Sequence, residues 1–162
     1  MRFAFAVRLA GLAEGETKSR EFLTLALGRA YRLGEKAAVF GSPESRSVPA
    51  GVPTAVVREQ MIVFRRLCAD VNCDSCFGRR LAVEPVNHNE TNFINTLAAA
   101  QETVGEVERA EIGLAAHIYH FAMEREGADI LLEAPDLLCN VLLANPAGPC
   151  FLKPGTRLSA TP

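Results

Sequence analysis

Three features that would place this chain in a familiar class are missing from it. No stretch approaches the roughly 20 consecutive apolar residues of a transmembrane helix, which predicts a soluble protein. The net charge is −2 and the basic residues are scattered, so no basic surface for nucleic acid is indicated. There is also no Gly-x-Ser-x-Gly motif, phosphate-binding glycine loop or dinucleotide fingerprint, which leaves those enzyme classes without support.

The N-terminal residues also lack the apolar core of a secretory signal, because Arg8 interrupts it. Phenylalanine and alanine alternate over residues 2–7, and this alternation predicts a first β-strand. A short targeting segment is the alternative interpretation. We therefore expect a protein of the mitochondrial matrix side or the bacterial cytoplasm that is not secreted.

Apolar residues make up 49% of the 162 positions, enough for the core of a single domain. The pattern predicts elements of both kinds, with strands towards both ends and helices between them, and hence an α+β fold. The predicted helices cover 17–33, 52–64, the end of 87–101, and 104–126; the predicted strands cover 36–41, 46–51, 79–85 and short segments after 128.

Three of the five cysteines lie close together in "LCADVNCDSCFGRRL", which is interpreted as a loop. Cys68, Cys73 and Cys76 have the Cys-x4-Cys-x2-Cys spacing of plant-type [2Fe–2S] ligation, which a distant fourth cysteine completes. Two bridged ferric ions need four soft anionic ligands, and one loop can supply three of them. Cys139 is the better candidate for the fourth ligand, and Cys150 is the other.

Around these cysteines the sequence resembles a β-grasp [2Fe–2S] ferredoxin. The resemblance rests on "SVPAGVPTAVVREQMIVFRRLC", "CDSCFGRRL" and "DLLCNVLLANPAGPCFL". It implies a single domain over 1–162, with a ferredoxin-like core at about 36–95 and 130–158 and helical additions at about 17–33 and 104–126. It also implies a [2Fe–2S] cluster held by four cysteine ligands: Cys68, Cys73, Cys76 and Cys139.

The function implied by that resemblance is one-electron transfer, as a carrier or as a subunit of a larger respiratory or redox complex rather than a stand-alone enzyme. The expected partner is a redox protein or the host complex, with no nucleic acid and no membrane span. A structural subunit that keeps the ferredoxin fold with a single zinc or iron ion, or with no metal, is one alternative. Buried cysteines without any cofactor are another.

A second resemblance is to DsrE-like sulfur-relay proteins, and it rests on the opening strand–helix–strand pattern and on "VNCDSCFGRRL". It implies that Cys73 or Cys76 carries a persulfide, activated by Arg79, Arg80 or a helix N-terminus.

Two histidines in the predicted helix over 104–126 have a spacing that can bind metal. His117 and His120 are three residues apart, and Glu124 follows one turn later. Ile118 and Phe121 mark the apolar stripe of that helix, however. The favoured interpretation is therefore that the histidines flank the stripe, one solvated and one hydrogen-bonded.

Overall fold

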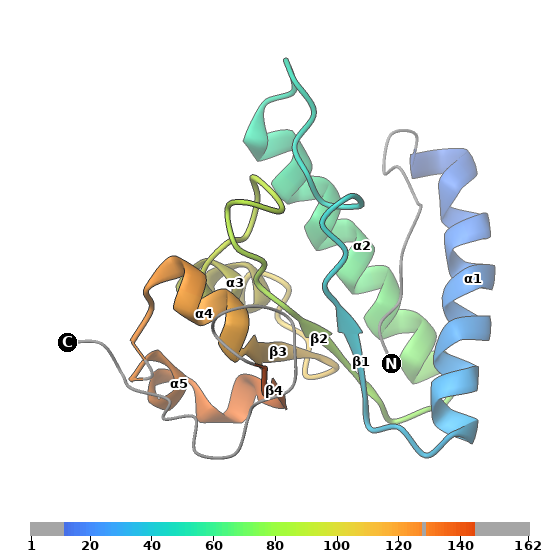
Figure 1. Cartoon of the computed structure of the whole chain (residues 1–162). Helices are drawn as coiled ribbons and strands as arrows, with labels where there is room; N and C mark the ends of the chain where they lie inside the picture. Colours follow the sequence, from blue (N-terminus) through green and yellow to red (C-terminus); the bar gives the residue numbers. More distant parts are fainter. Residues whose placement is uncertain (1–11, 128, 145–162) are drawn as a thin grey trace.

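The computed structural model describes residues 12–127 and 129–144, in which four parallel strands form one sheet. The strands are neighbours in chain order: β1 (Ala37–Phe40), β2 (Arg80–Val83), β3 (Ile112–His117) and β4 (Leu138–Leu142). The helical segments are α1 (Leu12–Arg32), α2 (Thr54–Asp74), α3 (Leu97–Gly105), α4 (Ile118–Glu124), α5 (Ile130–Glu133) and the 3-10 turn η1 (Pro135–Leu137). Parallel neighbours need a crossover connection, and helices lie in all three crossovers (Figure 1).

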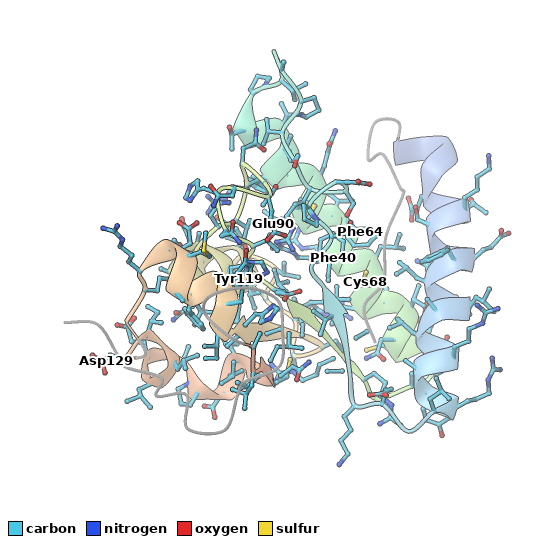
Figure 2. The ribbon with its side chains drawn as sticks, viewed as in Figure 1. Phe40, Phe64, Cys68, Glu90, Tyr119 and Asp129 are labelled. Atoms are coloured by element: carbon cyan, nitrogen blue, oxygen red, sulfur yellow. The ribbon has the colours of Figure 1, made fainter. Side chains whose placement is uncertain are left out.

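Alternate strand residues point to opposite faces of the sheet, and the helices cover one of them. On that face Phe40, Val83 and Leu114 are at most 2% exposed and belong to the main apolar cluster. Met61 and Phe64 of α2 belong to the same cluster, and the rings of Phe40 and Phe64 lie 5.4 Å apart (Figure 2). α1 packs along α2 and reaches β1, so two helices cover the β1 side of the sheet (Figure 1).

The opposite face of the sheet is concave and is lined by small side chains. Val39, Ala82 and Ala115 are fully buried there, and Cys139 and Leu142 pack against them. The sheet curls until β1 and β4 approach each other.

The β-grasp ferredoxin prediction, and with it the α+β class, is wrong. All strand pairs in the described part of the chain are parallel and sequential, which defines an α/β fold. The predicted strand at 46–51 is absent, because the Asn92 side chain satisfies the backbone of Val48 through bonds of 2.8 and 3.1 Å. The strand predicted at 2–7 and Cys150 lie outside the described residues.

The long helix predicted over 104–126 is also wrong. α3 ends at Gly105, and β3 and the short α4 occupy most of that segment. Leu114, Ile118 and Phe121 do recur at helical spacing, but residues 112–117 are all buried. A continuous buried strand and a buried helix cannot be distinguished by periodicity alone.

The helices predicted over 17–33 and 52–64 are confirmed as α1 and α2. α2 continues to Asp74, so the segment interpreted as a cysteine loop is largely helical. Among the described residues, no helix combines the length and apolarity needed to cross a membrane.

Candidate functional site

A buried carboxylate and two buried imidazoles meet where β2 and β3 end. Glu84 follows the last residue of β2, His117 is the last residue of β3, and His120 lies in the first turn of α4. Carboxyl ends of neighbouring parallel strands lie at the same edge of a sheet, which is where α/β proteins place their sites. This placement brings together residues that are 33 positions apart in the chain.

The three side chains are in direct contact range. The Nδ1 of His117 lies 2.7 Å from Oε1 of Glu84, and the Nε2 of His120 lies 3.9 Å from the same oxygen. The two rings meet edge to face, with centroids 4.8 Å apart. One donor atom from each of the three residues lies within 4.8 Å of the others, and their exposed fractions are 0%, 9% and 4%.

Neighbouring residues position the His120 ring and the Glu84 carboxylate. The backbone N–H of Asn87 donates to Nδ1 of His120 at 3.3 Å, and the Asn87 side-chain nitrogen lies 2.8 Å from the same atom. An accepting Nδ1 leaves the proton of neutral His120 on Nε2, so binding of a metal ion through Nε2 would require that proton to move to Nδ1. On the other side, a Cβ at Gly41 would overlap the Glu84 carboxylate.

A buried arginine supplies positive charge near this group. Arg46 is 1% exposed and donates to the carbonyl oxygens of Phe40 and Ser42 at 3.2 and 3.4 Å. Burial lowers the pKa of Arg46 to about 10, and the negative charge of Glu84 opposes that shift. Arg46 therefore offsets part of the cost of burying Glu84.

The three residues form a donor set that suits a divalent ion. One carboxylate with two imidazoles is the ligand set of several catalytic zinc sites, and mixed N and O donors suit other first-row metals. The interpretation of His117 and His120 as flanking residues, one of them solvated, is wrong, because both are buried. Glu124 instead pairs with His88, and its Oε2 lies 2.6 Å from Nδ1 of the His88 ring.

The four predicted cysteine ligands are spread over different surroundings. Cys68 is buried in the helix-side core on α2 (Figure 2), whereas Cys139 packs on the concave face of the sheet. The sheet therefore lies between these two thiols. Cys73 and Cys76 are exposed at the end of α2.

The comparisons identify the family. The family model for xylose isomerase-like TIM barrels matches residues 4–146, so the chain belongs to that family. The four parallel strands of the described residues, with their helices, correspond to part of such a barrel. No functionally curated protein shows significant sequence similarity to the chain.

Solved structures agree with this assignment. D-allulose 3-epimerase from Methylomonas sp., crystallised with D-allulose, is 26% identical with a TM-score of 0.68, over 80% of this chain and 45% of that one. An AP endonuclease of family 2 from Brucella melitensis is 21% identical (TM-score 0.70; 85% and 51% covered). The 3-keto-D-glucoside 4-epimerase of E. coli is 20% identical (TM-score 0.68; 89% and 57% covered). The chain thus spans about half the length of these structures.

The family assignment overturns the functional predictions made from the cysteines. The chain belongs to a barrel family with sugar epimerase relatives, so the cysteine-based predictions are wrong. These are the electron-carrier role, the [2Fe–2S] cluster with its zinc or iron alternative on a ferredoxin fold, the structural ferredoxin subunit and the DsrE-like sulfur relay. Glu84, near the end of the predicted strand 79–85, was the sequence signal that could have pointed to this site. It indicates a site only together with the parallel pairing of β2 and β3, which brings it to the histidines.

Proposed function

We propose that this chain contributes a divalent-metal site to an enzyme that isomerises or epimerises a sugar. The observation that carries the proposal is the buried group of Glu84, His117 and His120 at the carboxyl ends of β2 and β3. In TIM barrels this end of the strands carries the active site. The family match and the epimerase relatives support a sugar as the substrate class.

The three residues would hold the ion through one carboxylate oxygen and the imidazole nitrogens. A bound divalent ion supplies Lewis-acid polarisation of a sugar carbonyl or hydroxyl oxygen. Glu84 brings the negative charge that attracts the cation. In the metal-free protein, the positive charge of Arg46 stabilises the buried Glu84 carboxylate. Asn87 orients the His120 ring, and the absence of a side chain at Gly41 leaves room for the Glu84 carboxylate.

A nucleic-acid substrate is less well supported, although one relative is an AP endonuclease of family 2. Its similarity to this chain is 21% in sequence, which shows the fold alone. The net charge of −2 also offers no general attraction for a phosphate backbone.

Metal binding is the direct test. Apo protein is titrated with Mn²⁺, Co²⁺ and Zn²⁺ by calorimetry, and Co²⁺ binding is followed by its visible absorption. Glu84→Gln and His117→Asn should each weaken binding at least about tenfold, since even changes to residues that only hydrogen-bond to metal ligands cost about 10–100-fold. His88→Asn is the matched control, because the His88 side chain is 65% exposed and lies outside the group.

Equal affinity in Glu84→Gln and His88→Asn would contradict the metal site. The sugar assignment is tested separately by incubating metal-loaded protein with D-allulose and following epimer formation by NMR. Metal binding without turnover of any ketohexose or aldose would retain the site and reject the sugar substrate.

A further inference from the structure

The opposite end of the sheet carries a second cluster of reactive side chains. A cavity of about 360 Å³ is lined there by residues that include Asn72, Cys73, Cys76, Arg79 and Glu111. Arg79 precedes the first residue of β2 and Glu111 precedes the first residue of β3. The cavity therefore lies at the amino ends of the strands whose carboxyl ends carry the candidate metal group.

Two free thiols that are three residues apart line this cavity. Cys73 lies in the last turn of α2, and Cys76 is the second residue beyond the helix. The backbone N–H of Cys76 donates to the carbonyl of Cys73 at 3.0 Å, and Cys76 has φ of +52°. The left-handed conformation of Cys76 turns the chain back beside the end of α2, and a disulfide between the two residues needs their Cβ atoms about 3.5–4.5 Å apart.

The segment that carries Cys76 is anchored at both ends. The Asn72 side chain accepts from the Arg79 N–H at 3.0 Å and donates to the Arg79 carbonyl at 2.6 Å, which closes the loop between them. Phe77 packs on α1, with its ring 5.7 Å from that of Tyr31. A loop that is already closed loses little further entropy when its two thiols are joined.

Charged neighbours distinguish the two thiols. The Cys73 thiol donates to Oε1 of Glu111 at 2.8 Å, and an Arg109 nitrogen lies 3.7 Å from the sulfur. The hydrogen bond to Glu111 raises the pKa of Cys73, so Cys73 is held as the protonated thiol. Glu111 stays ionised, because the same hydrogen bond lowers its own pKa. The hydrogen bond that holds the Cys73 proton on Glu111 therefore assigns Cys73 as the resolving thiol and Cys76 as the attacking one.

We propose that Cys73 and Cys76 form a reversible dithiol–disulfide site that exchanges with low-molecular-weight disulfides. The Cys76 thiolate attacks a small disulfide RSSR, forming a mixed disulfide and releasing one RS⁻. Cys73 then gives its proton to solvent through the Glu111 carboxylate and attacks the Cys76 sulfur, which releases the second RS⁻. In sum, two protein thiols are oxidised to one disulfide while RSSR is reduced to two RSH. The site is independent of the proposed sugar chemistry.

The test is a redox titration of the full chain in buffers of reduced and oxidised glutathione. Remaining thiols are alkylated and counted by intact mass, and the disulfide is located by peptide mapping. Wild type should lose two alkylatable thiols without retaining glutathione, and the mapped bond should join Cys73 to Cys76. Cys139→Ser is the matched control and should behave as wild type, because Cys139 packs on the concave face.

Single variants test the order of the steps. Cys73→Ser should accumulate one stable glutathione adduct on Cys76, whereas Cys76→Ser should acquire its adduct on Cys73 more slowly. Adding Glu111→Gln to Cys76→Ser should speed alkylation of Cys73 near pH 7, because glutamine lacks the carboxylate whose hydrogen bond raises the pKa of Cys73. Stable glutathione adducts on both wild-type thiols, a disulfide to another cysteine, or two thiols that stay reduced at every ratio would overturn the proposal.

Discussion

At the scale of single residues, the candidate site depends on a carboxylate that is fully buried. Glu84 is 0% exposed, and a buried charge is tolerated only with compensating partners. His117 at 2.7 Å and the nearby Arg46 provide that compensation. Gly41 contributes by having no side chain, because its missing Cβ is the space that the carboxylate occupies.

We therefore predict that Gly41→Ala displaces the Glu84 carboxylate. The added methyl group would overlap a buried side chain, and overpacking of this kind costs about 1–3 kcal/mol. Urea unfolding measures the loss, and Co²⁺ binding should weaken in parallel. Gly105→Ala is the control, since a Cβ there meets nothing within 4 Å and alanine favours the helix by about 0.5–1 kcal/mol. Equal stability of the two variants would count against the displacement.

At the scale of elements, two side chains cap the N-terminus of α3. Thr96 is its N-cap, and the Thr96 hydroxyl oxygen accepts from the Ala99 N–H at 3.1 Å. The Glu126 carboxylate, from beyond α4, accepts from the Leu97 and Ala98 N–H groups at 2.8–3.4 Å. Burial raises the pKa of Glu126, while these backbone bonds oppose the shift. The start of α3 is thus tied to the segment that follows the candidate site.

Removing the local cap should destabilise the protein measurably. We expect Thr96→Ala to lower the free energy of unfolding by about 1 kcal/mol, the usual cost of an N-cap. Thr24→Ala is the matched substitution, because Thr24 is exposed on α1 and its hydroxyl donates to the Arg20 carbonyl of its own helix. Its effect should stay within about 0.5 kcal/mol. Equal losses in chemical denaturation would show that Thr96 does not act as a cap.

β3 shows why one element escaped sequence-based prediction while its neighbours did not. α1 ends near Gly34 and α2 starts after Pro53, so residues that break helices mark the ends of two segments with clear helical periodicity. β3 has no such boundary and is buried along its whole length. Gly113 is also set by the fold, because a Cβ there would lie 2.6 Å from the Leu137 carbonyl oxygen. Gly113 and Leu137 are far apart in the chain, so their contact produces no pattern in the local sequence around β3.

At the scale of the whole molecule, ligand binding and folding are linked through the candidate site. Glu84 and His117 come from two strands, so an ion held by both binds the folded chain and not the unfolded one. We expect added Mn²⁺ or Co²⁺ to raise the melting temperature and EDTA to reverse the rise. At 100 times the dissociation constant, the stabilisation is about 2.7 kcal/mol.

Scanning calorimetry across a metal series checks this expectation. Glu84→Gln should show almost no metal-dependent shift, and His88→Asn should keep the full shift of wild type. A shift of equal size in Glu84→Gln would place the stabilising ion elsewhere on the protein.

Elements whose signals are local can be predicted from the amino-acid sequence alone. The periodicity of α1 and α2 and the short apolar runs of β1 and β2 depend on neighbours within one or two turns, and they were predicted correctly. The cysteine spacing is equally local, and it was misleading because the same spacing fits a helix end. The parallel pairing of the strands, in contrast, follows from tertiary contacts, and this pairing brings Glu84 to His117 across 33 positions. Strand pairing depends on long-range contacts, which a single sequence does not display.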